Sequence, residues 1–350
     1  MSTLIDSDID DICVGLGEYA QRFDGKRVLI TGARGFVGQY LTAVFRRLNA
    51  KYLREPCQVL AMDNLRTPAD GSATPLEDPH ITFVEHDVVL PFSPGGKVDF
   101  VVHAAGIASP YYYRKFPLET MDVATHGLRN MLDVARADGA RLLFLSSSEI
   151  YGNPDATHVP TAEDYNGNVS CLGPRSCYDE SKRFGETLLQ VYVQQFGVEA
   201  VIVRPFNVYG PGLSREDYRI MPNIAVRLST GEAIDVYGDG TQTRTFCYAT
   251  DAIVGFLLAL LRGRPGEAYN VGASGPEVSI IDLLELVRDS VPAPDLKYTV
   301  RDYPDSYPGD EPMRRCPDLV KAFDHLGYEP TVPFTDGLRK FITWSQEYYR

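Results

Sequence analysis

The sequence has few cysteines, and their spacing is not that of a metal or redox site. Its 350 residues include six cysteines, with no CxxC pair and no cluster of cysteines and histidines at zinc-ligand spacing. A disulfide-stabilised scaffold and a structural zinc site are therefore excluded, and we expect no metal ion. Scattered cysteines in a long chain are typical of a reduced, cytoplasmic protein, which is the localisation we expect.

Long hydrophobic runs are also missing. The longest apolar stretch, residues 252–261, has ten residues, whereas a helix that spans a membrane needs about 20. The first 20 residues are acidic, whereas a secretory signal begins with basic residues and continues with an apolar run. We therefore expect no leader, no membrane span and no membrane partner.

Basic residues are outnumbered by acidic ones. The chain has 34 Lys and Arg against 47 Asp and Glu, which gives a formal net charge of −13. This charge repels nucleic acids and anionic membrane surfaces at long range, so nucleic acid is not an expected partner. A small anionic ligand can still bind, because a few local arginines and one helix N-terminus suffice to hold a phosphate.

Short aliphatic runs alternate with longer amphipathic stretches from residue 27 onward. The expected strands are residues 27–31, 58–62, 81–85, 98–104, 141–147 and 199–205, and the expected crossover helices are residues 36–48, 118–137 and 178–196. This alternation is typical of an α/β protein with a doubly wound parallel sheet, the Rossmann fold. The strands lack a strict apolar–polar alternation, as expected for strands buried on both faces.

The rhythm changes after residue 207, where proline and glycine become frequent. Here we expect helices at residues 221–230, 251–261, 280–290 and 336–349, a pair of strands at 233–237 and 244–248, and a loop at 303–317. The sequence thus predicts an N-terminal extension (1–25), a dinucleotide-binding domain (26–206) and a smaller, mixed α/β substrate-binding lobe (207–350). Residues of about 240–262 are expected to return to the first domain. The lobe should cover the carboxyl ends of the strands, where open α/β sheets bind their ligands.

A glycine-rich turn follows the first expected strand. Gly32, Gly35 and Gly38 have the spacing GxxGxxG, and a helix is expected directly after them. Such a turn lets the backbone approach a pyrophosphate at the helix N-terminus. Asp63 ends the next strand, where a carboxylate binds the ribose hydroxyls of NAD and repels the extra phosphate of NADP. The pattern predicts an NAD site; a merely tight turn between strand and helix is the alternative.

A tyrosine and a lysine lie one helical turn apart near the start of a later helix. The spacing of Tyr178 and Lys182 places the phenol and the ammonium group on the same helix face. A neighbouring positive charge favours the phenolate, which can take a proton from an alcohol while hydride leaves the alcohol carbon. A surface pair is the alternative, but the upstream glycine turn and the serines at 146–148 favour a catalytic pair.

Recognisable motifs occur in a fixed order from residue 26 onward. They are RVLITGARGFVG, HDV at 86–88, HAAG at 103–106, SSSEIYGNP, GPRSCYDESKR, RPFNVYGPG and the segment around TQTRTFCY. Together they resemble the extended short-chain dehydrogenases/reductases of the nucleotide-sugar epimerase, dehydratase and decarboxylase group. Within that group the sequence is most similar to the UDP-glucuronate decarboxylases, or UDP-xylose synthases. The resemblance implies NAD as cofactor, a nucleotide sugar as substrate, and a homodimer.

The resemblance also assigns roles to single residues. Those implied to bind the cofactor are Gly32, Gly35, Phe36, Val37, Gly38, Asp63, Asn64, Asp87, Val88, Ala104, Ala105, Tyr178, Lys182 and Pro205. Those implied to be catalytic are Ser147, Glu149, Tyr178, Lys182 and Arg315, and those implied to bind substrate are Tyr113, Asn207, Arg244 and Arg315. Ser147 would hold the sugar hydroxyl, Glu149 would lie near sugar C5, and Arg315, or its neighbour Arg314, would face the substrate carboxylate.

The resemblance favours one reaction and leaves others open. The favoured reaction is decarboxylation of a UDP-linked uronic acid, UDP-glucuronate to UDP-xylose, through a 4-keto sugar with internal return of hydride. A 4-epimerase or a ring-form mutase needs no pair such as Glu149 and Arg315. A 4,6-dehydratase would lack its acid, because Ser148 stands where that group has aspartate. A non-catalytic nucleotide-sugar binder is the remaining alternative.

Some positions depart from the decarboxylase pattern or carry no pattern of their own. Ser181 replaces a usual glycine, and Gly212 replaces a usual arginine. His103 has no partner base and no neighbouring metal ligand, so we expect it to be buried at a strand end with its ring nitrogens hydrogen-bonded.

Overall fold

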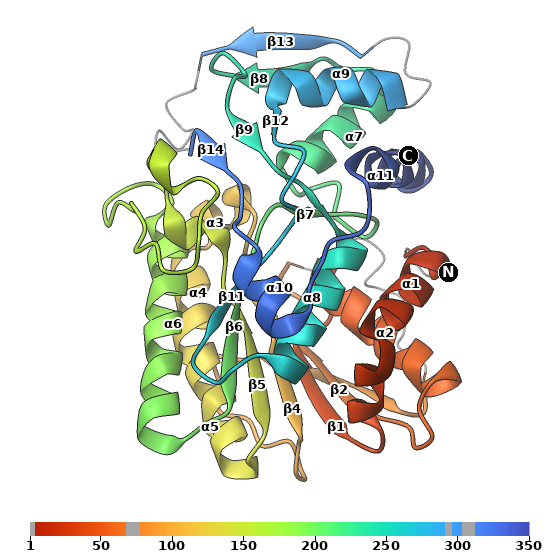
Figure 1. Ribbon diagram of the computed structural model, residues 1–350, viewed down its shortest axis with the longest axis vertical. Helices are drawn as coiled ribbons and strands as arrows, with labels where there is room; N and C mark the ends of the chain where they lie inside the picture. The colour runs from red at the N-terminus through yellow and green to blue at the C-terminus, as the bar shows by residue number, and fades with distance from the viewer. Residues whose placement is uncertain (1–3, 68–77, 291–295, 303–311, 350) are drawn as a thin grey trace.

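A seven-stranded parallel sheet forms the centre of the computed structural model, which describes residues 4–67, 78–290, 296–302 and 312–349 (Figure 1). The order of the strands is β11-β6-β5-β4-β1-β2-β3. Their bounds are β1 Arg27–Thr31, β2 Gln58–Asp63, β3 Ile81–Glu85, β4 Phe100–His103, β5 Arg141–Leu145, β6 Ala200–Pro205 and β11 Ala268–Val271. The chain therefore has the doubly wound α/β fold that the sequence predicts.

Helices cover both faces of this sheet and bury neighbouring residues of each strand in different cores. In β1, Val28 and Ile30 belong to the core under one group of helices, and Leu29 belongs to the core under the other. The first group consists of α1 (Asp6–Leu16), α2 (Phe36–Lys51) and α8 (Ala249–Arg262), and the second includes α5 (Leu128–Asp138) and α6 (Ser176–Phe196). Successive side chains of a strand point to opposite faces, so a continuous apolar run is what a doubly covered strand requires.

The C-terminal part has a separate hydrophobic core, and in Figure 1 it lies at the top of the sheet. This core is formed mainly by α7 (Ile220–Thr230), β8 (Ile234–Tyr237), α9 (Ile280–Ser290) and α11 (Phe334–Tyr348). The smaller strands of this part are β7 (Val208–Tyr209), β9 (Thr243–Arg244), β10 (Cys247–Tyr248), β12 (Val278–Ser279), β13 (Tyr298–Arg301) and β14 (Arg314–Arg315). Short α10 (Val320–Leu326) follows them. The domain boundaries drawn from the sequence stay a prediction.

Several expectations for the C-terminal part are wrong. The two strands expected to pair with each other do not: β8 pairs with β13, β9 pairs with β12 and β14, and β10 pairs with β7. Of the loop expected at 303–317, residues 303–311 lie outside the described residues, and Arg314–Arg315 form β14. Two-residue strands are set by partners distant in the sequence, so no local pattern marks them.

The N-terminal segment joins the two parts of the molecule. Asp8 of α1 is fully buried; its carboxylate accepts hydrogen bonds from Tyr248 Oη at 2.6 Å and from Lys340 Nζ of α11 at 2.8 Å. A Cβ atom on Gly212 would lie 2.8 Å from the Leu4 side chain, and Gly212 has φ +89°. This segment therefore occupies the space next to Gly212, where the resemblance leads one to expect an arginine side chain.

None of the helices within the described residues is long and apolar enough to span a membrane. All six cysteines are free thiols. In the same described ranges, acidic, histidine and cysteine side chains form no group of three or more suited to a metal ion.

Candidate active site

Two adjoining pockets open where the strands of the sheet end. The larger has a volume of about 590 Å³ and the smaller about 270 Å³, and both are lined by Gly32, Gly35 and Ala104. The other predicted residues in the larger pocket are Phe36, Val37, Gly38, Tyr113, Ser147, Glu149, Tyr178, Lys182, Pro205, Asn207, Arg244 and Arg315. Those in the smaller pocket are Asp63, Asn64, Asp87, Val88 and Ala105. The structure therefore brings every predicted site residue to one continuous surface.

The glycine-rich turn after β1 leaves no room for side chains. Gly32 has φ +70°, and a Cβ atom there would lie 2.7 Å from Ala105 Cα. A Cβ atom on Gly38 would lie 2.1 Å from the carbonyl oxygen of Gly32. The turn thus packs directly on the neighbouring backbone, and α2 begins at the pockets with free N–H groups, an arrangement that suits a pyrophosphate.

Asp63 lies at the end of β2 in the smaller pocket. Its carboxylate accepts hydrogen bonds from the backbone N–H groups of Arg34 and Leu65, each at 2.8 Å. Burial raises the pKa of Asp63. Nearby, Asn64 Nδ2 donates to the carboxylate of Asp87 at 3.1 Å. These groups suit ribose hydroxyls and a nucleobase, so the smaller pocket fits the adenosine end of a dinucleotide.

Tyr178 is buried in the larger pocket, near the start of α6. Its ring stacks on that of Tyr113, with ring centroids 5.4 Å apart and planes inclined by 14°. Burial raises the pKa of Tyr178 to about 12, although a hydrogen bond with Ser147 and the charge of Arg219 act in the opposite direction. The lowered tyrosine pKa expected from the neighbouring lysine is therefore absent from this structure, because burial outweighs the favourable contacts.

Lys182 lies one turn further along α6. Its ammonium group donates to the carbonyl oxygen of Leu145 at 2.7 Å and lies 4.9 Å from the centroid of the Phe144 ring. Burial lowers the pKa of Lys182 to about 8. The lysine is thus fixed at the end of β5, and its protonated form still predominates at neutral pH, by a smaller margin than for an exposed lysine.

Glu149 is held between two arginines. Arg315 donates to both oxygens of its carboxylate, to Oε2 at 2.7 Å, and Arg175 also donates to Oε2. Burial by itself would raise the pKa of Glu149, but the charges and hydrogen bonds of Arg175 and Arg315 lower it to about 2. Glu149 is therefore a carboxylate at neutral pH and not a proton donor.

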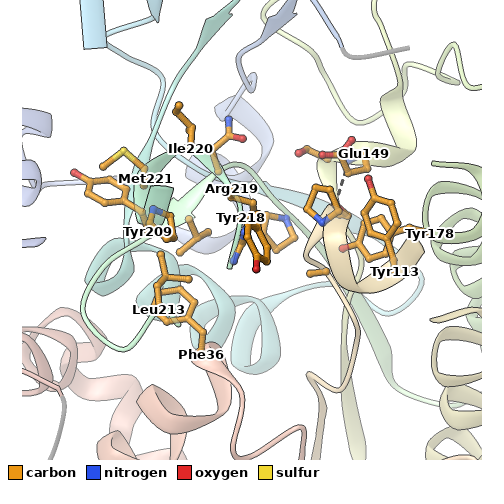
Figure 2. A pocket seen from close by; sticks show the side chains of 18 of the residues that line it. Phe36, Tyr113, Glu149, Tyr178, Tyr209, Leu213, Tyr218, Arg219, Ile220 and Met221 are labelled. Carbon is orange, nitrogen blue, oxygen red and sulfur yellow. Dashed lines mark hydrogen bonds between the residues drawn. The ribbon is translucent and has the colours of Figure 1, made fainter. Parts of the chain in front are cut away.

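Arg175 and Arg219 also line the larger pocket, and the sequence analysis missed both. In the view of Figure 2, Arg219 lies between the cluster of Tyr113, Glu149 and Tyr178 and the more apolar side of the pocket. The charge of Arg219 acts on Tyr178, and its guanidinium binds Asp217 at 2.5 Å. Arg175 belongs to the GPRSCYDESKR motif, but its ion pair with Glu149 joins residues 26 positions apart, and no local sequence pattern predicts such a pair.

The arginines assigned to the substrate differ in their surroundings. Arg244 is buried and donates to the carbonyl oxygens of Thr243 at 2.8 Å and of Met313 at 3.3 Å. Of the two adjacent arginines in β14, Arg315 lines the pocket, whereas Arg314 pairs with Glu277 at 2.7 Å.

A contact between the two parts of the chain lies at the larger pocket. Tyr111 of α3 (Pro110–Lys115) packs on Tyr218, with ring centroids 4.5 Å apart, and Tyr112 Oη donates to Glu216 at 3.0 Å. Tyr111 and Tyr218 both line the pocket. We call these four residues the tyrosine clasp.

His103 is structural, as expected. It is fully buried, its Nδ1 lies 2.9 Å from Thr31 Oγ1, and its Nε2 lies 3.1 Å from the carbonyl oxygen of Val123. Burial lowers the pKa of His103 to about 3, so the ring stays neutral at physiological pH.

Comparison with known proteins identifies the family. The model of the NAD dependent epimerase/dehydratase family matches residues 28–272, more than half of the chain. The chain belongs to this family. Among its epimerase/dehydratase relatives, UDP-glucuronic acid decarboxylase 1 of Danio rerio is 37% identical over 93% of this chain and 74% of the relative. UDP-glucuronic acid decarboxylase 6 of Arabidopsis thaliana is 38% identical over 89% of this chain and 86% of the relative.

Solved structures with the epimerase/dehydratase fold are similar to almost the whole chain. UDP-glucuronic acid 4-epimerase of Bacillus cereus, in complex with NAD and UDP-4-deoxy-4-fluoro-glucuronic acid, has a TM-score of 0.78 and 25% identity, over 92% of this chain and 99% of that one. dTDP-glucose 4,6-dehydratase of Streptomyces venezuelae, with NAD bound, has a TM-score of 0.77 and 26% identity, over 92% and 97%. Since these two enzymes are an epimerase and a dehydratase, the shared fold alone does not select the reaction.

Proposed function

We propose that this protein decarboxylates a UDP-linked uronic acid, converting UDP-glucuronate to UDP-xylose. The observation that carries the proposal is the neighbourhood of Tyr178, where Arg219 and the ion pair of Glu149 and Arg315 line the same pocket. A sugar hydroxyl that reaches Tyr178 therefore has positive charge available for an adjacent carboxylate. The names of the decarboxylase relatives support the same reaction.

NAD is the proposed cofactor. At Gly32 and Gly38 of the turn, neighbouring backbone atoms occupy the space that a Cβ atom would need. Asp63 at the end of β2 offers a carboxylate for ribose hydroxyls. When bound, NAD would take a hydride from sugar C4 and return it to the same carbon at the end of each cycle.

The residues around Tyr178 handle the proton of the sugar hydroxyl. Ser147 hydrogen-bonds with Tyr178 and would orient the C4 hydroxyl toward it. Tyr178 takes the hydroxyl proton, which requires positive charge close to the phenol because burial raises its pKa. Lys182 and Arg219 are cations of this chain that can supply such charge.

Decarboxylation follows from the chemistry of the oxidised sugar. In the 4-keto sugar the carboxylate is β to the carbonyl, so the bond to carbon dioxide breaks and its electron pair enters the ketone as an enolate. Protonated Tyr178 and Ser147 can hydrogen-bond to this enolate oxygen. Carbon C5 then takes up one proton from the solvent, because the overall reaction consumes a proton, Tyr178 keeps its own proton for the C4 oxygen, and Glu149 stays ionised.

Arg315 and Arg219 have different roles in the proposed reaction. The assignment of Arg315 to the substrate carboxylate stays a prediction, and both of its Nη atoms already bind Glu149. Arg219 is the other guanidinium whose charge reaches Tyr178 and Glu149, and it binds Asp217 through Nε and Nη2, not through Nη1. We therefore propose that Arg315 holds Glu149 in place and that Arg219 addresses the substrate carboxylate. Arg244 and Asn207 would bind the diphosphate.

The experiment that tests the proposal is a product analysis. Purified protein is mixed with UDP-glucuronate and a catalytic amount of NAD+, and the nucleotide sugar is followed by mass spectrometry, with UDP-glucose as a parallel substrate. Loss of one carbon dioxide from UDP-glucuronate is the expected result. An unchanged mass after complete incubation contradicts the proposed reaction.

The second candidate is an isomerase, either a 4-epimerase or a ring-form mutase. The structural similarity to a UDP-glucuronic acid 4-epimerase favours it. A change in the NMR spectrum of the sugar without loss of mass would identify it. Full isomerising activity of a Glu149→Gln variant would point the same way, because an isomerase substrate needs no carboxylate beside the arginines whose charge Glu149 balances.

We further propose a homodimer that forms through α4 (Pro117–Asp122) and α6. Apolar side chains on these helices are exposed: Leu118 and Met121 on α4, and Phe184 and Val191 on α6. Neighbouring exposed apolar side chains on contacting helices suit an interface between identical copies. Light scattering should give the mass of a dimer for the wild type and of a monomer for Phe184→Glu; a monomeric wild type at micromolar concentration contradicts the proposal.

Free thiols fit the cytoplasmic location that we propose.

A further inference from the structure

A buried ion pair lies behind the catalytic surface. Glu186 of α6 accepts hydrogen bonds from Arg204 of β6, at 3.0 Å from Nε and 2.7 Å from Nη2, and from Ser146 Oγ at 2.6 Å. Its side chain is 12% exposed and that of Arg204 is 10% exposed. Three donors thus fix the position of this carboxylate, although no step of the proposed mechanism uses it.

The same strand end holds Lys182. Glu186 follows Lys182 by four residues, so both side chains lie on one face of α6. The lysine donates to the carbonyl oxygen of Leu145, and the carboxylate accepts from the next residue, Ser146. Consecutive residues at the end of β5 therefore anchor the ammonium and the carboxylate.

Among the titratable groups around Lys182, Glu186 is the one whose negative charge favours the ammonium form. Tyr178 lies on the same helix face as Lys182, and His103 of β4 is neutral at physiological pH. Arg204 of β6 binds the Glu186 carboxylate and also donates to Tyr151 Oη at 2.7 Å. Burial disfavours the charged form of Lys182, and the negative charge of Glu186 opposes this effect.

We propose that Glu186 is a positioning residue that keeps Lys182 protonated, and that Arg204 and Ser146 hold Glu186 in the place where it does so. The inference rests on the proposed function, in which charged Lys182 stabilises the phenolate of Tyr178. Glu186 itself does not contact the reacting atoms in this scheme. Its effect passes through the lysine to the tyrosine.

The test measures ionisation of the tyrosine and needs no sugar substrate. Burial raises the pKa of Tyr178 in the unliganded protein, whereas in the NAD+ complex the positive charge of the nicotinamide ring should add to that of Lys182 and lower it. Ultraviolet difference spectra of that complex should therefore contain one tyrosine ionisation that is absent from Tyr178→Phe. In Glu186→Gln, loss of the carboxylate favours neutral Lys182, the phenolate loses its neighbouring charge, and the titration should move to higher pH by about one unit.

Glu163→Gln is the matched control. Glu163 is a half-buried carboxylate of the same network: its side chain accepts the N–H of Asn270 at 2.8 Å, and its carbonyl oxygen accepts from Arg204 at 2.8 Å. Lys182 is not among the groups that set its ionisation. This variant should therefore titrate like the wild type.

Two results overturn the inference: a Glu186→Gln titration at the wild-type pH, or an equal shift in Glu163→Gln. If Glu186→Gln does not fold, as judged by circular dichroism, Ser146→Ala provides the test, because it removes one of the three bonds that hold the carboxylate. Its titration should shift in the same direction by a smaller amount, and an unshifted titration again overturns the inference. A shifted titration without carbon dioxide release would support the role of Glu186 while contradicting the proposed reaction.

Discussion

Tyr178 is the residue on which the proposed proton transfer depends. Tyr178→Phe removes the phenol oxygen and leaves the ring, so the stacking on Tyr113 is preserved. We expect turnover to fall by at least about a hundredfold, as is usual for loss of a general base. NAD+ affinity, measured by fluorescence titration, should stay close to that of the wild type. Turnover within a few-fold of the wild type would contradict the assignment.

The ion pairs of Glu149 should stabilise the folded protein. Glu149→Gln leaves Arg175 and Arg315 without their shared negative partner, and breaking such a buried ion pair costs about 3 kcal/mol. We expect this loss in the free energy of unfolding at pH 7, as measured by urea denaturation.

The loss of unfolding free energy caused by Glu149→Gln should depend on pH. The pKa of Glu149 is lowered in the folded state to about 2 from an ordinary value of 4.5. Its ionised form therefore stabilises the protein above pH 4.5, and the contribution disappears as the pH falls from there toward 2. The difference between the wild type and Glu149→Gln should shrink over that range. A difference that is constant from pH 7 to pH 3 would contradict the ion-pair explanation.

The residues of the site were predictable where a motif fixes the backbone. Gly32 and Asp63 follow directly from a strand, a turn and a second strand, and Tyr178 and Lys182 follow from the spacing of one helical turn. Arg219 was not predictable, because it lies directly before α7, outside the recognised motifs, and reaches the catalytic cluster only through the packing of the C-terminal part against the sheet. The raised pKa of Tyr178 also needed the structure, since burial has no signature in a four-residue spacing.

The tyrosine clasp connects two elements that are far apart in sequence. Tyr111→Ala removes the ring that packs on Tyr218, the residue before Arg219. We expect KM for the nucleotide sugar to rise several-fold, because the segment that carries Arg219 loses a contact that orders it. The affinity for NAD+ should not change, since Tyr111 does not line the adenosine pocket. An unchanged KM would contradict a role of the clasp in substrate binding.

Asp8 of helix α1 should contribute to stability, because it links α1 to Tyr248 and to Lys340 of α11. Asp8→Ala leaves Lys340 and Tyr248 without their buried acceptor, and we expect a loss of about 2 kcal/mol in the free energy of unfolding. Asp11→Ala is the control: the Asp11 side chain is 62% exposed and lies 3.8 Å from Lys340, so its loss should cost less than about 0.5 kcal/mol. Equal losses in urea denaturation would contradict a special role for Asp8.

Elements with a strong local pattern were predictable and short ones were not. The apolar runs of β1 and β5 identify strands that both faces of the sheet bury. By contrast, β9 and β14 have two residues each, and they exist because Arg315 pairs with Arg244 across 71 positions. Strand β11 was missed because its four residues, AYNV, include a buried asparagine and form no long apolar run.

At the scale of the whole molecule, the charge of the pocket opposes the charge of the chain. Six arginines line the larger pocket, namely Arg114, Arg175, Arg219, Arg227, Arg244 and Arg315, while the net charge is −13. The pocket should therefore attract an anionic nucleotide sugar against a repulsive background, and salt should screen both effects. Because the arginines are closer to the ligand, we expect KM to rise several-fold between about 50 and about 500 mM salt, which are about threefold below and above 0.15 M. A constant or falling KM in steady-state assays would contradict the prediction.

The two ends of the described chain meet beside the ligand pocket. Leu4 packs next to Gly212, and Tyr349 Oη donates to the carbonyl oxygen of Leu213 at 2.8 Å. Leu213 itself lines the larger pocket. Packing of the described ends therefore supports one wall of the pocket, and ligand affinity should be measured on protein from which terminal purification tags have been removed.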